Sequence, residues 1–163
     1  MKNTLTALVL GLSLLVASIG NGYAQDFQKG LEAVQKGDFK TALREWSALA
    51  EQGDADAQYN LGLMYRKGDG VTQDYKEAVK WYRKAAEQGH ETAQNNLGLM
   101  YAKGQGVLQD NVYAHMWMNI AASNGNSSWA KNRDIVAKRM TASDISKAQA
   151  LARECVKKEY KGC

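Results

Sequence analysis

The chain has 163 residues, a formal net charge of +4, two cysteines and no proline. Ala, Leu, Lys, Gln and Glu are abundant and runs of β-branched residues are absent, so the composition favours helices and disfavours a strand-rich fold. The charge is uneven, because residues 26–126 contain 11 basic and 13 acidic residues whereas residues 127–163 contain 9 and 4.

The first 24 residues have the pattern of a cleaved signal peptide. Lys2 supplies a positive charge near the start, and residues 7–19 are mainly apolar. Gly22 and Ala24 provide small residues at the two positions that a signal peptidase recognises. Cleavage is predicted after Ala24. A membrane anchor is the alternative, but the apolar run is shorter than the roughly 20 residues needed to cross a bilayer. No cysteine lies near the predicted cleavage point, so a lipid-anchored form is not indicated. We therefore expect a periplasmic or secreted protein.

A 36-residue repeat organises the rest of the chain. Residues 55–90 and 91–126 are identical at 19 of 36 positions. Residues 25–54 form a weaker, divergent copy with a short turn around Gly37 and Asp38. Self-similarity at this period is typical of stacked helical repeats.

Each copy is expected to fold as a helix, a turn and a second helix. Ala57, Leu61 and Tyr65 are four residues apart and predict one buried stripe. Gly62 lies inside the first helix, where glycine costs about 1 kcal/mol relative to alanine, so a second helix is expected to cross there. Asp74 is placed to cap the second helix. The matching residues of the next copy are Ala93, Leu97, Tyr101, Gly98 and Asp110.

The pattern A-x-x-x-L-G-x-x-Y-x-x-G-x-G-V-x-x-D-x-x-x-A-x-x-W-x-x-x-A-A-x-x-G occurs at residues 57–89 and 93–125. It resembles the Sel1-like repeat, a relative of the tetratricopeptide repeat, and residues 25–54 resemble a tetratricopeptide unit. The resemblance implies an all-α fold, an α-solenoid built as a right-handed superhelix. It also implies a scaffold that binds other proteins and needs no cofactor.

Residues 127–163 are expected to form a basic C-terminal cap of two helices. Thr141 and Asp144 have the spacing of a capping box that opens the second helix. Cys155 and Cys163 are expected to form a disulfide in an oxidising compartment. The basic residues suit a solvated face, anionic lipid headgroups or an acidic partner. Nucleic acid is also possible from charge alone, but an exported protein rarely meets it.

The candidate catalytic and metal-binding residues are few. Ser128 and Lys131 have the Ser-x-x-Lys spacing of penicillin-binding enzymes, but neither Ser-Asp-Asn nor Lys-Thr-Gly accompanies them. His90 and His115 are the only histidines, and His115 is expected on a helix surface or half-buried, at the place that Val79 has in the preceding copy. We therefore predict no catalytic, cofactor or metal site.

The predicted partner-binding residues lie on the first helix of each repeat, away from its buried stripe. In tetratricopeptide-like superhelices the first helices line the concave face. The expected residues are Tyr59, Leu63, Arg66, Asn95, Leu99 and Ala102. Simple solvent exposure of these side chains is the alternative interpretation.

Three classes of function are compatible with the sequence. The favoured one is an exported, non-enzymatic scaffold or adaptor of the bacterial cell envelope that binds a protein or peptide. The second is an immunity-type inhibitor of an exported toxin. The third is a penicillin-binding or β-lactamase-like enzyme. The Cys155–Cys163 spacing resembles that of secreted Sel1-like proteins described as penicillin-binding, although in those proteins it recurs in every repeat and here it occurs once.

Overall fold

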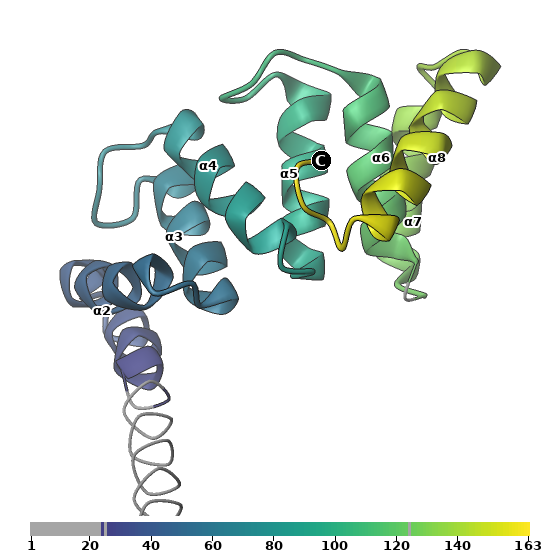
Figure 1. Ribbon diagram of the computed structural model, residues 1–163. Coiled ribbons are helices and arrows are strands. Elements are labelled where there is room, and N and C mark those ends of the chain that lie inside the picture. Colours follow the sequence, from purple (N-terminus) through teal and green to yellow (C-terminus); the bar gives the residue numbers. More distant parts are fainter. Residues whose placement is uncertain (1–23, 25, 124) are drawn as a thin grey trace, which may run out of the picture.

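The computed structural model describes residues 24, 26–123 and 125–163, and all regular structure within them is helical (Figure 1). The predicted signal peptide, residues 1–24, lies outside these residues except for Ala24. Residues 26–35 are helical and precede seven helices. These are α2 (Phe39–Glu51), α3 (Ala55–Lys67), α4 (Tyr75–Ala86), α5 (Glu91–Lys103), α6 (Asn111–Ala122), α7 (Ser127–Ala137) and α8 (Ala142–Lys157).

The helices stack in pairs along the molecule, as the all-α solenoid prediction requires. α3 packs on α4, α5 packs on α6, and α4 and α5 join one pair to the next. None of the helices in the described part of the chain is both long enough and apolar enough to cross a membrane.

The N-terminal caps set where the helices begin. Asp74 accepts hydrogen bonds from the backbone N–H groups of Lys76 and Glu77 at 2.8 and 3.1 Å, and Asp110 caps α6 in the same way. Thr141 and Asp144 form the predicted capping box of α8. Each cap satisfies backbone donors that have no partner inside the helix, so the predicted helix starts are confirmed.

Two helical glycines allow the helices of a pair to approach closely. A Cβ at Gly62 would lie 2.6 Å from the ring of Tyr82, and a Cβ at Gly98 would lie 2.8 Å from Cγ of Met118. The helix crossings predicted from these glycines are confirmed.

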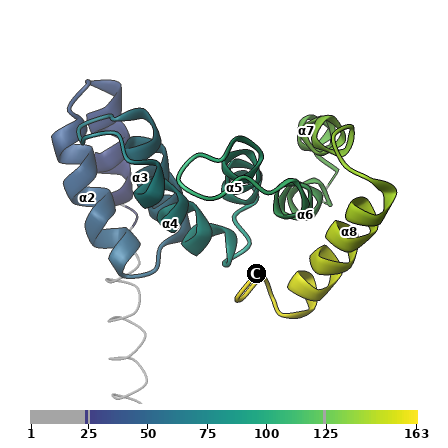
Figure 2. The ribbon, with the colours of Figure 1, turned by 90° about the horizontal axis from the view of Figure 1, so that it is seen from above.

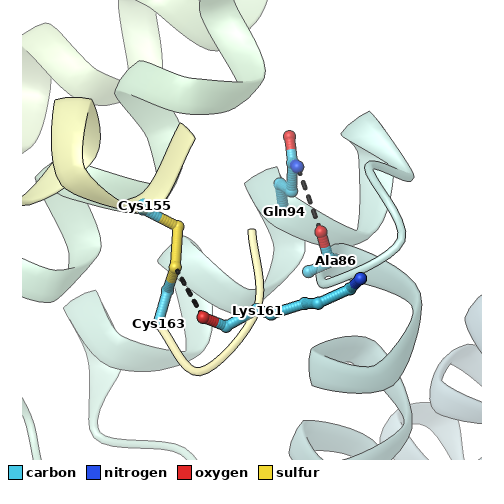
Figure 3. Close-up of a disulfide and its surroundings, with 5 residues drawn as sticks. All are labelled: Ala86, Gln94, Cys155, Lys161 and Cys163. Carbon is cyan, nitrogen blue, oxygen red and sulfur yellow. Dashed lines mark hydrogen bonds between the residues drawn. A yellow bond between two sulfur atoms is a disulfide. The ribbon is translucent and has the colours of Figure 1, made fainter. Parts of the chain in front are cut away.

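A repeated side-chain hydrogen bond ties each pair to the preceding helix. Gln58 donates from Nε2 to the carbonyl oxygen of Ala50 at 3.0 Å. Gln94 donates in the same way to Ala86 at 3.1 Å (Figure 3). Both glutamines are buried. Each amide is a second donor to its carbonyl, because Ala50 also accepts from the backbone N–H of Gly53 and Ala86 from that of Gly89.

The last two helices lie against α6 on different sides. α7 and α8 each pack on α6, and α8 does not pair with α7 as α4 pairs with α3. On α4 the outward positions are Glu77, Lys80 and Lys84, whereas the residues 36 positions later on α6 are Tyr113, Met116 and Ile120. These apolar residues belong to the core cluster that Ala152 and Cys155 of α8 complete. α8 therefore covers an apolar face of α6, at the place where α4 has polar residues.

The chain ends in a loop closed by the predicted disulfide. Cys155 and Cys163 are bonded, with their Cα atoms 5.6 Å apart (Figure 3). Tyr160 lies in this loop, and a Cβ at Gly89 would be 3.3 Å from its ring. The loop therefore lies against the turn between α4 and α5, and it links the end of the chain to the middle of the stack.

His115 corrects one prediction, because it is buried and not on a helix surface. Its exposed fraction is 3 %, close to the 6 % of Val79 at the matching position. Nδ1 has no hydrogen-bond partner among the described residues. Burial, followed by the nearby charge of Arg133, lowers the pKa of His115, while Asp134 opposes this weakly. The sequence could not show that α7 would cover this part of α6.

The lowered pKa makes stability depend on pH. The unfolded chain takes up a proton at His115 near its ordinary pKa of about 6.5, whereas the folded protein takes it up only at lower pH. Above the pKa of the unfolded chain, His115 therefore does not reduce the free energy of unfolding. This free energy is expected to fall as the pH drops through that pKa. His115→Val copies the preceding repeat and should remove this contribution.

Chemical denaturation of both proteins between about pH 8 and pH 5 tests this prediction. His90 is present in both, so the difference between the two pH profiles isolates His115. Parallel profiles would show that protonation of His115 does not oppose folding.

Candidate partner-binding surface

The first helices of successive pairs keep a constant register. α3, α5 and α7 begin at Ala55, Glu91 and Ser127, which are 36 residues apart, and their N-caps are Asp54, His90 and Asn126. In the view of Figure 2, α3, α5 and α7 follow one another along one side of the stack. α7 is therefore the first helix of a further unit that follows the copy at residues 25–54 and the two repeats. Residues on α3, α5 and α7 can be compared position by position.

The predicted residues of α3 take part in local packing. The ring of Tyr59 stacks on that of His90 with centroids 4.7 Å apart. Arg66 donates from Nε to the hydroxyl group of Tyr82 at 3.2 Å, and burial raises the pKa of Tyr82 to about 12. Leu63 is half-buried.

Two of the predicted residues on α5 are not accessible. Asn95 is 5 % exposed and accepts a hydrogen bond from Nδ2 of Asn132 at 3.1 Å. Ala102 is 8 % exposed and belongs to a core cluster with Val136 of α7. α7 covers both, because it continues the row of first helices. Leu99 remains half-buried at the edge of this contact.

A groove of about 230 Å³ lies between α5 and α7. Its floor is formed by Met118 of α6. The other lining residues are Leu99, Ala102 and Lys103 of α5, and Asn132, Ile135, Val136 and Arg139 from α7 and the residues just after it. Ile135 is 53 % exposed. The groove is thus mainly apolar, with two basic side chains in its lining.

The corresponding place between α3 and α5 is occupied by polar side chains. There Tyr82 replaces Met118, and its hydroxyl group interacts with Arg66 and Asn96. Arg66 and Asn96 are the register equivalents of Ala102 and Asn132. The two places therefore differ at two positions, where Ala102 replaces Arg66 and Met118 replaces Tyr82.

Two rows of matching residues run across the three first helices. The first row is apolar and half-buried or exposed, and consists of Leu63, Leu99 and Ile135. The second row is basic and exposed, and consists of Lys67, Lys103 and Arg139. Each basic residue lies four positions after the apolar residue from the same helix, and side chains four residues apart share a helix face. Leu63 and Leu99 were predicted from the sequence, whereas Ile135 and the basic row were not. The 36-residue spacing from Leu99 and Lys103 was the signal for them.

The candidate catalytic residues are not assembled into a site. Ser128 and Lys131 are both exposed in the first turns of α7, and no hydrogen bond joins their side chains among the residues described. His90 caps α5 by accepting a hydrogen bond from the backbone N–H of Ala93 at 3.1 Å. Within the described ranges, no group of three or more His, Cys, Asp or Glu side chains could hold a metal ion.

Comparisons with known proteins agree with this geometry. The model of the Sel1 repeat family matches residues 55–90 and 92–126. The crystal structure of a protective antigen present in uropathogenic Escherichia coli strains, which displays an SLR fold, is similar with a TM-score of 0.79 and 32 % identity. The similarity covers 85 % of this chain and 31 % of that one.

A Sel1 repeat protein from Oxalobacter formigenes is similar with a TM-score of 0.59 and 35 % identity, over 64 % of this chain and 41 % of that one. The chain thus spans less than half the length of either structure. A search of curated proteins found no match. The resemblance inferred from the sequence is confirmed: residues 55–90 and 92–126 are Sel1 repeats, and the similar solved structures are those of Sel1-repeat proteins.

Proposed function

We propose that this protein is an exported, non-enzymatic adaptor of the bacterial cell envelope that binds a protein or peptide through its first helices. Sel1 repeat proteins generally mediate protein–protein interactions. The observation that carries the proposal is the row of Leu63, Leu99 and Ile135, which puts one incompletely buried apolar side chain on each first helix. Exposed apolar residues that continue across a scaffold mark interaction sites more often than single scattered ones do.

Two features support export. The N-terminal residues have the charge and apolar pattern of a signal peptide. The Cys155–Cys163 disulfide suits an oxidising compartment, where such bonds form and persist. Mass spectrometry of the protein isolated from the envelope tests export. The expected mature N-terminus is Gln25, and a full-length protein found only inside the cell contradicts export.

Affinity capture from an envelope extract tests the binding function. The wild type is expected to retain one partner in a fixed ratio, and Leu63→Gln with Ile135→Gln should reduce its recovery at least tenfold. Leu108→Gln with Val156→Gln is the matched control. Leu108 is 89 % exposed and Val156 is 48 % exposed, and both lie off the row, so this variant should retain the partner.

Equal loss in both variants, or in neither, would contradict the assignment to the first helices. Covalent attachment of a labelled penicillin to Ser128 would contradict the non-enzymatic role. Circular dichroism of each variant establishes that the helical fold is kept.

A further inference from the structure

The groove between α5 and α7 has a composition that selects a particular kind of partner. Its surface is mainly apolar, and the charged side chains that line it are Lys103 and Arg139. Both are exposed, and neither forms an ion pair within the described part of the chain. We propose that this groove receives an apolar side chain from an acidic peptide segment, whose carboxylates contact Lys103 and Arg139. The inference rests on the proposed function and names the chemistry of the partner.

The size of the groove fits a side chain. Its volume of about 230 Å³ is below the range of about 300–1,000 Å³ that is typical of pockets for small molecules and cofactors. Leu99 and the half-exposed Ile135 lie in its walls, and Met118 forms its floor. A methionine floor adapts its shape to different apolar side chains. The groove therefore suits a Leu-sized or Phe-sized side chain of a protein.

The charges of the groove determine which peptides can place such a side chain in it. Asp134 is the acidic residue of α7, and it pairs with Arg133 at 2.8 Å. It does not line the groove, whose lining carries two positive charges and no negative one. Electrostatic complementarity favours an acidic segment, and like charge excludes a basic one. Lys67, one repeat earlier in the same row, extends the positive strip toward α3.

The chain itself supplies a variant that closes the groove. Arg66 holds the place of Ala102 in the preceding repeat, where it lies beside the hydroxyl group of Tyr82. Ala102→Arg with Met118→Tyr copies that arrangement and should fill the groove. Lys103→Gln with Arg139→Gln leaves the groove open but removes its charge. This second variant keeps the test valid if the first one does not fold.

Fluorescence anisotropy of four labelled peptides tests the proposal with the full mature protein. The first peptide has a central leucine flanked by glutamates. The others replace the leucine by serine, the glutamates by glutamines, or the glutamates by lysines. Only the first peptide is expected to bind saturably at low salt, and its affinity should fall as salt is raised because exposed charges are screened.

Each groove variant should weaken binding of the first peptide at least tenfold. Lys40→Gln with Lys147→Gln is the matched control, because it removes two exposed charges outside the groove and should leave binding unchanged. Failure of the acidic peptide to bind, equal binding by the variants, or tighter binding of the lysine peptide would overturn the proposal.

The two proposals fail in different ways. If the envelope partner is captured but the acidic peptide neither binds nor competes, the partner chemistry is wrong and the binding function stands. If the peptide binds in the groove but no partner is captured from the envelope, the groove assignment stands and the adaptor function fails.

Discussion

Trp117→Ala is expected to lower the free energy of unfolding by about 3–5 kcal/mol, the usual range for removing a large aromatic side chain from a core. Trp117 is the largest fully buried side chain in the described structure, with an exposed fraction of 0 %. It lies in the core cluster to which α4, α5, α6 and α8 contribute. The cavity left by alanine would border four helices, which cannot all move inward together. Urea denaturation followed by circular dichroism measures the change.

Two further variants separate packing from other effects. Nε1 of Trp117 has no hydrogen-bond partner among the described residues, so Trp117→Phe loses volume but no hydrogen bond and should cost much less than Trp117→Ala. Trp129 is only half-buried at the start of α7, and Trp129→Ala should cost about 1 kcal/mol. A loss at Trp117 as small as that at Trp129 would contradict a core centred on α6.

Gly106→Ala is expected to destabilise the protein by about 3 kcal/mol, from backbone conformation and steric overlap together. Gly106 has a φ of +73°, and an added Cβ would overlap the carbonyl group of Tyr75 and lie 2.8 Å from the backbone nitrogen of Lys76. The loop between α5 and α6 therefore packs directly on the start of α4. Gly70 packs in the same way on Phe39 at the start of α2, where an added Cβ would lie 2.6 Å from Cβ of Phe39. This contact explains the second glycine of each repeat loop.

Gly125→Ala is the matched control for the steric part. Gly125 has a φ of +89°, and apart from Gly125 and its two neighbours no atom of the described residues lies within 4 Å of an added Cβ. This variant has the cost of a left-handed backbone alone, about 1–2 kcal/mol. Denaturation curves of the two variants should therefore differ by more than about 1 kcal/mol. Equal losses would show that the loop does not depend on close contact with α4.

The helix order could be read from the sequence because local signals repeat. Asp74 and Asp110 cap helices through contacts two or three residues away, and such contacts leave a pattern in the sequence. Gly62 and Gly98 predicted close helix crossings for the same reason. The disulfide was predicted from the position of Cys155 and Cys163 near the end of the chain and from the expected compartment.

The cap was harder to predict because its contacts are distant in sequence. Identities between the repeats reveal the shared helix positions and give no information on the positions that differ. The change from Lys80 and Lys84 to Met116 and Ile120 shows that something covers α6, but it does not identify α8. The burial of Asn95 depends on Asn132, which lies 37 residues later.

The groove could not be predicted, because it depends on three helices at once. Ala102 and Met118 leave space only when α7 lies opposite α5. Neither residue is unusual on its helix, and Ala102 was predicted on an open surface. The difference between Arg66 and Ala102 was visible, but its meaning required knowledge of Tyr82 and its contacts.

Hydrogen exchange of the protein, alone and with its captured partner, tests whether the first helices form the binding surface. We expect slower exchange in α3, α5 and α7 on binding, centred on the residues around Leu99 and Ile135, with little change in α4. Protection confined to α4 or α8, with exchange in α5 and α7 unchanged, would contradict it.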